Sequence, residues 1–280
     1  MPEEVKVQAV IPIKDARVPL EVVEDIAAYY GIDQAETVRR LTELDPAEMA
    51  RAWEAARPST PAEIRAFYAA SDHYIWETTT WNYGPGYDAQ WQALRQLEAL
   101  FPPARFPRVL DYGCGVGSAA FYLADRGYTV TAADVPGRTL DFVRDRAARH
   151  GRKVQLVEIR QDLPDFPAES FDVVVCLDVL EHVPNPEKVL AGLARALRVG
   201  GAAALRVTFE RDELLPFHLS DNWERFGRTH NWWLYVNALG LDGAGADLIY
   251  RRVSPWRVAL RQARFRLWRA TGVFFMRVPR

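Results

Sequence analysis

Cysteines, long apolar runs and targeting signals are scarce or absent in this chain of 280 residues, and each absence excludes a class of protein. The two cysteines, Cys114 and Cys176, are too few for the disulfide framework of a secreted domain and fit a reducing compartment. No apolar run approaches the roughly 20 residues of a membrane-spanning helix. The first residues lack the basic segment, apolar core and cleavage site of a secretory signal. We therefore expect a cytoplasmic protein.

Acidic residues are missing from the last 30 positions, which carry nine arginines. The overall charge of −2 therefore hides a tail of +9 and a body of −11, with 26 basic against 37 acidic residues. Arginines alternate with large apolar residues between Pro255 and Arg269, which is typical of a helix at a membrane interface. A helix packed on the sheet or on a second subunit explains the pattern too, because the apolar residues do not form one clean stripe. The composition of Val273 to Val278 favours a last strand that completes the sheet.

Strands and helices alternate along the second part of the chain. We expect strands near 108–112, 129–135, 154–160, 171–177 and 202–209, and helices near 118–126, 137–150 and 186–197. This alternation requires a parallel sheet, and ligand sites of such sheets lie at the carboxyl ends of the strands. Residues 20–71 predict short helices, with start signals at Asp33, at Asp45-Pro46 and at Ser59-Thr60-Pro61.

Three alternating glycines, Gly113, Gly115 and Gly117, follow the first of these strands and lead into a helix. A backbone without side chains lets a ligand approach closely, and the N–H groups at a helix start attract an electron-rich group. A dinucleotide-binding loop has its third glycine where this chain has Ser118. Asp111, two residues before the first glycine, would repel a pyrophosphate but can hold an ammonium group. We therefore expect a ligand with a ribose and a positive charge, and without a phosphate.

The segment Asp111-x-Gly113-x-Gly115-x-Gly117 resembles the first motif of the class I S-adenosylmethionine-dependent methyltransferases. The resemblance continues through 129–134, 160–163, 171–183 and 197–201, in the family's order, and covers residues 105–250. It implies an α/β fold with a Rossmann-like sheet, and S-adenosylmethionine as cofactor with S-adenosylhomocysteine as product. It also implies an enzyme that transfers a methyl group to an oxygen or nitrogen of a small-molecule acceptor. The stretch from Asp178 to Val183 is similar to that of quinone-biosynthesis and natural-product methyltransferases.

The resemblance implies a cofactor-binding role for each matching residue. Asp134, at the end of the second strand, would bind both ribose hydroxyls, and Asp162 would meet the adenine amino group. The backbone near Leu177 and Asp178 would hold the methionine moiety. The residues expected to bind the cofactor are Asp111, Gly113, Cys114, Gly115, Gly117, Asp134, Val135, Asp162, Leu163, Leu177 and Asp178. No metal site is expected.

Two aromatic segments predict an apolar or aromatic acceptor. One lies between Phe67 and Trp91, before the first strand of the sheet, and the other between Phe217 and Tyr235, after the last. In this family such segments form a lid and a substrate pocket, although core packing explains some aromatic residues equally well. The residues expected to bind the acceptor are Trp76, Trp81, Tyr83, Trp223 and Trp232. A base is needed only if the acceptor must lose a proton, and the candidates are His182, His218 and His230.

We therefore expect an N-terminal helical cap or lid over residues 1–104 and a methyltransferase domain over residues 105–280, with a substrate insertion near 210–240. Nucleic acid is not an expected partner, because no Asn-Pro-Pro-Tyr motif occurs and the helix-turn-helix-like stretch from Ile26 through Val38 has a second helix with more acids than arginines. The acids are Asp33, Glu36 and Glu43, and the arginines are Arg39 and Arg40. Two alternatives stay open: methylation at a membrane surface through the arginine-rich tail, and a regulator that binds the cofactor without turnover. Peripheral membrane contact and a homodimer are left open as well.

Overall fold

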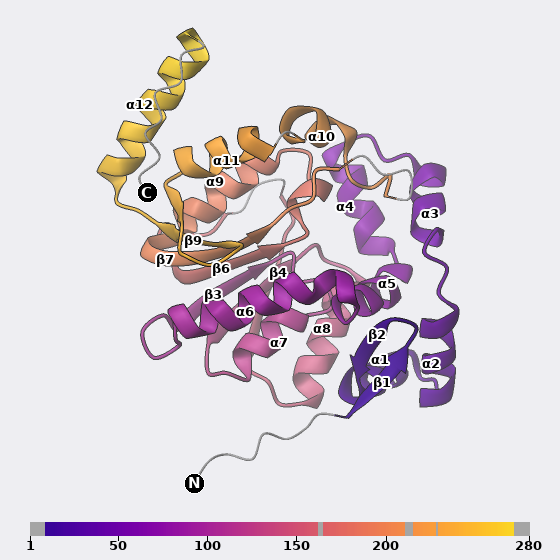
Figure 1. The fold of residues 1–280 in the computed structure, drawn as a ribbon. Coiled ribbons are helices and arrows are strands. Elements are labelled where there is room, and N and C mark those ends of the chain that lie inside the picture. The colour runs from indigo at the N-terminus through magenta and orange to yellow at the C-terminus, as the bar shows by residue number, and fades with distance from the viewer. Residues whose placement is uncertain (1–8, 162–164, 211–214, 228, 272–280) are drawn as a thin grey trace.

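The computed structural model describes residues 9–161, 165–210, 215–227 and 229–271. These residues form a seven-stranded sheet in the order β5-β4-β3-β6-β7-β9-β8, with helices on both faces (Figure 1). The strands are β3 (Arg108–Tyr112), β4 (Thr129–Asp134), β5 (Val154–Glu158), β6 (Phe171–Leu177), β7 (Leu197–Arg206), β8 (Leu241–Gly243) and β9 (Ile249–Arg252). The α/β fold with a Rossmann-like sheet is confirmed.

The five strands expected from the sequence all occur, and they pair in parallel. Strand β7 begins at Leu197, five residues earlier than expected, although Gly200 inside it has the left-handed φ of +80° that the expected turn requires. Strands β8 and β9 were missed, because three and four residues are too short to give a periodic signal. Strand β9 runs antiparallel to both β7 and β8 and so extends the sheet beyond its parallel part.

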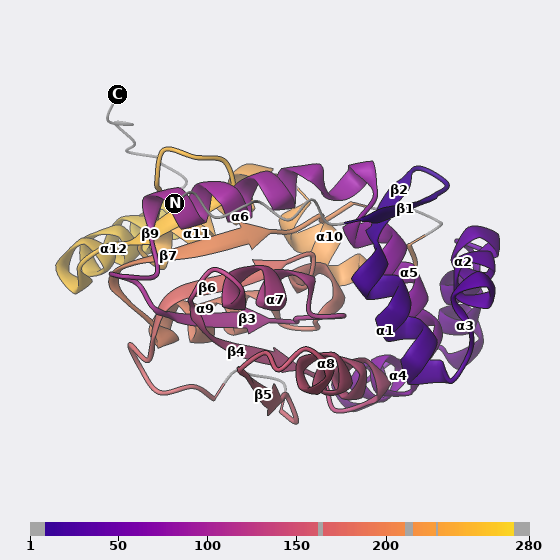
Figure 2. The same cartoon turned by 90° about the horizontal axis from the view of Figure 1, so that it is seen from below.

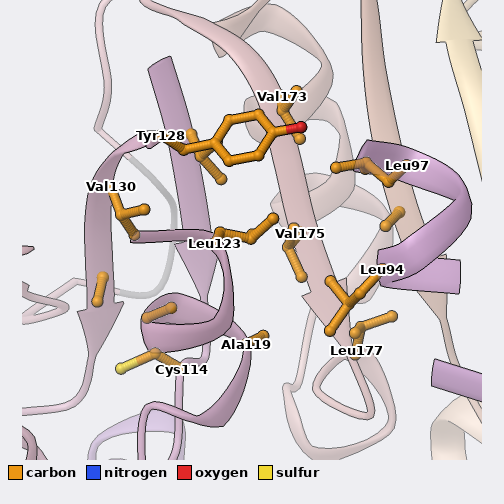
Figure 3. Packing of buried hydrophobic residues seen from close by; sticks show 14 of the residues in the cluster. Leu94, Leu97, Cys114, Ala119, Leu123, Tyr128, Val130, Val173, Val175 and Leu177 are labelled. Carbon is orange, nitrogen blue, oxygen red and sulfur yellow. The ribbon is translucent and has the colours of Figure 1, made fainter. Parts of the chain in front are cut away.

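Alternating residues of the central strands enter two separate cores, as the period of a strand requires. Val173 and Val175 of β6 face the helices α6 (Asp88–Leu100), α7 (Ser118–Ala124) and α8 (Arg138–Arg149), where they pack with Leu94 and Leu123 (Figure 3). Val174 and other residues of opposite parity face α9 (Pro186–Ala196) and α11 (Thr229–Ala238). Both faces of the sheet are therefore covered, and ligands can reach it only at the strand ends.

The N-terminal helices lie beyond the carboxyl ends of the strands, at the right of Figure 1 and of Figure 2. They are α1 (Leu20–Tyr30), α2 (Gln34–Glu43), α3 (Glu48–Ala56), α4 (Pro61–Ala70) and α5 (His73–Asn82). Two predicted start signals are confirmed: Asp33 accepts a hydrogen bond from the Glu36 N–H, and Thr60 forms a capping box with Glu63. A short hairpin, β1 (Val10–Ile13) and β2 (Ala16–Pro19), precedes α1 and was missed in the sequence.

A buried ion pair joins these helices to the sheet domain. The Arg146 Nε of α8 lies 2.8 Å from the Asp25 carboxylate of α1, and both side chains are buried. Arg146 also donates to the carbonyl of Val116, a residue of the glycine loop, over 2.6 Å. The N-terminal unit, α8 and the glycine loop are thus connected through one guanidinium group.

The last described helix, α12 (Pro255–Thr271), projects away from the body at the upper left of Figure 1. None of the described helices is both long enough and apolar enough to cross a bilayer. The predicted last strand, Val273 to Val278, lies outside the described residues.

Candidate cofactor site

The glycine loop between β3 and α7 adopts backbone angles that other residues rarely adopt. Gly113 has φ +72° and Gly117 has φ +82°. A Cβ atom on Gly113 would lie 2.4 Å from a methyl group of Val179, and one on Gly117 would lie 2.9 Å from the ring of Phe121. The loop therefore needs glycine both for its conformation and because its neighbours pack directly on the backbone.

Asp134 ends β4 next to this loop. Its carboxylate accepts hydrogen bonds from the N–H groups of Gly115 and Val135, each over 2.7 Å. Burial raises the pKa of Asp134 to about 6, against the lowering effect of these two hydrogen bonds. The carboxylate that the resemblance assigns to the ribose is thus held at the loop by the backbone.

Asp111 lies on β3 and is buried. One of its carboxylate oxygens, Oδ2, has no hydrogen-bond partner among the described residues. Burial and then the charge of Asp134 raise the pKa of Asp111 to about 7. An orphaned buried carboxylate oxygen fits a ligand with a positive charge, as expected for the ammonium group of S-adenosylmethionine.

A cleft of about 100 Å³ opens at the carboxyl ends of the strands. Five residues expected at the site line this cleft, namely Gly113, Asp134, Val135, Asp178 and His182. Cys114 and Leu177 are buried in the core on one face of the sheet, and Asp111, Gly115 and Gly117 also lie outside the lining. The structure therefore gathers part of the expected set in one place. Asp162 and Leu163 lie outside the described residues.

Helix α4 covers the cleft from the N-terminal side. Tyr68 of α4 and Tyr74 of α5 line it, although neither was among the expected site residues. The backbone of α4 comes so close to the loop after β4 that a Cβ on Gly137 would lie 2.3 Å from the Ala69 carbonyl oxygen. The aromatic segment from Phe67 to Trp91 was a signal for these tyrosines, but its spacing could not separate them from tyrosines and tryptophans of the core.

Asp178 follows β6 and has a left-handed φ of +55°, which is strained for a residue with a side chain. Its carboxylate accepts from the Arg206 guanidinium over 2.8 and 2.9 Å and from the Gln90 amide over 2.7 Å. These bonds fix the loop after β6 against β7 and α6. Val179, the next residue, packs on Gly113, so the fixed loop also shapes the glycine turn.

His182 lies in the short 3-10 helix after β6 (Leu180–His182) and lines the cleft. Its Nδ1 is 3.0 Å from the Tyr68 hydroxyl and 3.2 Å from the Phe217 carbonyl oxygen. A proton on Nδ1 would be donated to that carbonyl and would leave Nε2 as the proton acceptor. Burial, followed by the nearby His218, lowers the pKa of His182 to about 3. The ring is therefore neutral at physiological pH, but its pKa lies well below that pH, so His182 would be a weak general base.

His218 packs its ring edge-on against His182, with ring centroids 4.8 Å apart. The structure thus brings together two of the three histidines expected to act as bases, while the side chain of His230 lies outside the description. Donor atoms of Glu181, His182 and His218 all lie within 4.8 Å of one another, which is a spacing that a metal ion could use. The expectation of no metal site stays a prediction.

None of the five aromatic residues expected to bind the acceptor lines the cleft, and one of them, Trp223, is 40% exposed. Trp76 is buried and stacks on Tyr30 in the N-terminal core, and Tyr83 stacks on Trp91. Trp81 is 48% exposed and covers Gly86. The other displaced residue is Trp232, which packs in a cluster with Phe209, Phe226 and Tyr235. Aromatic density alone could not distinguish packing from binding.

Comparisons with known proteins agree with this geometry. Residues 110–205 match the family model described as a methyltransferase domain. A ubiquinone biosynthesis O-methyltransferase of Idiomarina loihiensis is 42% identical over 96 residues, which are 34% of this chain and 39% of that protein. The protein of the same description from Thiobacillus denitrificans is 34% identical over 142 residues, 50% of this chain and 60% of the relative. The chain thus matches between about two fifths and three fifths of the length of these two relatives.

Among solved structures, the YcgJ protein of Bacillus subtilis is similar with a TM-score of 0.44 and 21% identity, over 54% of this chain and 68% of that one. An overlap at this level carries no functional argument. The glycine loop and the Asp134 carboxylate both lie within the residues that match the family model. Residues 110–205, and this site with them, are therefore similar to a methyltransferase domain.

Proposed function

We propose that the protein transfers a methyl group from S-adenosylmethionine to an oxygen or nitrogen of a small-molecule acceptor. The observation that carries the proposal is the glycine loop beside the strand-end carboxylate of Asp134, with the orphaned Asp111 oxygen behind it. The ubiquinone-biosynthesis relatives are named O-methyltransferases, which favours oxygen as the accepting atom. A cytoplasmic location and a homodimer remain predictions.

The bound cofactor supplies an electrophilic methyl group, so the protein's own task is to bind, orient and exclude water. Asp134 would bind the ribose hydroxyls of the cofactor, and the Asp111 carboxyl group would pair with the positively charged ammonium group of its methionine moiety. The fixed loop at Asp178 and Val179 would hold the methionine moiety against Gly113. Residues 1–104 would act as the cap that closes the cleft, since Tyr68 and Tyr74 already form part of its wall.

The direct test measures methyl transfer without assuming which molecule accepts the methyl group. The protein is incubated with S-adenosylmethionine labelled in its methyl group and with a metabolite extract, and products carrying the label are identified by mass spectrometry. We expect labelled small molecules, which form more slowly with the Asp134→Ala variant when S-adenosylmethionine is below saturation. If label appears in nothing, or only in protein or nucleic acid, the proposal is wrong.

The histidine pair gives a second prediction. We expect His182→Ala to lower turnover by about 10²-fold, the lower end of the usual contribution of a positioned base, if the acceptor must lose a proton. Cofactor affinity should stay within about threefold, because the base contributes to the reaction and not to cofactor binding. His218→Ala tests the neighbouring ring in the same assay. Full turnover by both variants across the pH range would place the base elsewhere.

One observation favours a second role at membranes. Trp256, Leu260 and Leu267 of α12 are 64%, 54% and 53% exposed, and their spacing of four and seven residues puts them on one helical face. The exposed Arg257 and Arg264 lie on one side of this face and the exposed Arg266 on the other, as in helices that lie in the headgroup region. The side chains of Phe265 and Trp268 lie outside the description. Peripheral membrane contact through α12 is therefore part of the proposal.

A further inference from the structure

A second cleft, of about 620 Å³, lies beside the cofactor cleft. Three residues, Pro61, Ile64 and Pro184, line both clefts, so the two share a wall. His182 lines the first cleft and His218 the second, and the two rings touch edge-on. A volume of this size is typical of a small-molecule site. The two clefts adjoin at these three residues and at the pair His182 and His218.

Asn222 lines this second cleft and has an unsatisfied acceptor. It is only 1% exposed and donates from Nδ2 to the carbonyl of Val183 over 2.8 Å. Further contacts of Nδ2 with the carbonyls of Leu180 and Glu181 fix which way the amide faces. The amide oxygen Oδ1 is left without a hydrogen-bond partner among the described residues. A buried acceptor of this kind is costly unless a donor, such as an N–H or O–H of a ligand, meets it.

The charges around the second cleft are of one sign. Glu54, Glu210 and Asp221 line it, and within the described part of the chain no Lys or Arg does. None of the three carboxylates is ion-paired with another described residue. Trp53 and Trp223 supply aromatic walls, whose faces attract cations. Carboxylates, an amide oxygen and aromatic faces all select for a positively charged ligand that is rich in donors.

We propose that this second cleft binds the methyl acceptor and that the acceptor is a cationic, donor-rich ring compound, such as an aromatic alcohol that carries an amine. The inference rests on the proposed methyl transfer for its role, but the charge preference of the cleft stands on Glu54, Asp221, Asn222 and Trp223 alone. It assigns an acceptor-binding role to Trp53 and Asn222, which were not expected, and locates the expected role of Trp223.

Binding of three catechols that share a ring and differ in charge tests the proposal. The probes are dopamine, which is cationic, 4-methylcatechol, which is neutral, and 3,4-dihydroxyphenylacetate, which is anionic. Binding is followed at the indole N–H signal of Trp223 in NMR spectra of the full chain, with Trp223→Phe used to assign it. We expect dopamine to bind about tenfold more tightly than 4-methylcatechol, and the acid to bind most weakly.

The double variant Glu54→Gln/Asp221→Asn should reduce the preference for dopamine to within about threefold. The matched control Asp15→Asn, in the turn between β1 and β2, should leave it unchanged. Equal binding of dopamine and the acid, an unchanged preference in the double variant, or no binding of any probe would overturn the inference. Cofactor binding measured by calorimetry on the same samples separates this result from a failure of the methyltransferase proposal.

Discussion

Buried carboxyl groups with raised pKa values surround the candidate site. The pKa is about 7 for Asp111, about 6 for Asp134 and about 8 for Glu181, and burial is the largest cause in each case. Each pKa lies above the ordinary value near 4, so between about pH 4 and its folded pKa each group holds a proton in the folded chain that it has lost in the unfolded chain. The stability that these protons contribute is present at low pH and is lost as the pH rises through the folded pKa.

Glu181 gives the sharpest test of this linkage, because its pKa is highest and its Oε2 has no partner among the described residues. Its Oε1 accepts from the Thr208 N–H, a bond that Gln can keep. We expect the free energy of unfolding of the wild type to fall between pH 6.5 and 8, and Glu181→Gln to remove about 1 to 2 kcal/mol of that fall. Urea denaturation at both pH values measures it. Identical pH dependence in the two proteins would show that Glu181 is ionised already at pH 6.5.

At the residue scale, the sequence predicted positions that one local pattern determines. Gly113 and Asp134 follow from a strand, a glycine loop and a second strand in fixed order, and both line the cleft. Tyr68 and Asn222 could not be predicted in this way. Tyr68 reaches His182 across 114 positions, and the role of Asn222 depends on three carbonyls of a loop about 40 positions away. Such contacts depend on tertiary packing, which no local spacing encodes.

At the element scale, the long alternating strands and helices were predictable and the short strands were not. Strand β6 is apolar at every position except Asp172, and all seven of its residues are buried. The β1–β2 hairpin and the β8–β9 pair have strands of three or four residues, too short for a period of two to emerge. The capping signals at Asp33 and Thr60 predicted helix starts because a cap is a local hydrogen bond.

Helix α12 illustrates why exposure must be known before a pattern is interpreted. In the sequence, the apolar residues of α12 do not form one stripe, because residues that face the rest of the protein are counted together with residues that face outward. Val258 faces Gly240, whereas Trp256, Leu260 and Leu267 face outward. The outward set alone forms a stripe between arginines, which suits an anionic bilayer surface.

We expect the full chain to sediment with vesicles that contain phosphatidylglycerol, and the variant Trp256→Ser/Leu260→Ser to lose most of this binding. The physical reason is the loss of apolar area that would enter the interface, at about 25 cal/mol per Å². Leu100→Ser, which removes a 45% exposed leucine at the end of α6, is the matched control. Unchanged sedimentation of the double variant would contradict membrane contact through this face, and a shift in oligomeric state would point to a second subunit instead.

At the scale of the whole molecule, the N-terminal unit and the sheet domain are joined by charge as well as by apolar packing. Asp25 is fully buried and bonds to Arg146 and to the His150 ring, 2.8 and 2.7 Å away. Arg152 adds a partly buried pair with Glu21 of the same helix α1. Since Arg146 also binds the glycine loop, the N-terminal unit and the cofactor site should lose their structure together.

Asp25→Ala would leave the buried Arg146 guanidinium without its counter-charge, so we expect a loss of about 3 to 5 kcal/mol in the free energy of unfolding. Asp141→Ala, which removes an exposed pair with Arg144 on α8, should cost about 1 kcal/mol or less. Thermal and urea unfolding, followed by circular dichroism, compare the two variants. Equal losses would mean that the buried pair does not join the two units.

The most direct test of the account is calorimetric titration of S-adenosylmethionine into the wild type and into Asp134→Ala. The carboxylate of Asp134 would make charge-assisted hydrogen bonds to the ribose, each contributing about 1.5 to 3 kcal/mol. We predict binding weakened by roughly 10- to 100-fold in the variant, with a far-ultraviolet spectrum like that of the wild type. Asp15→Ala, remote from the cleft, should bind like the wild type. Unchanged affinity in Asp134→Ala, or tighter binding of NAD than of S-adenosylmethionine by the wild type, would contradict the assignment.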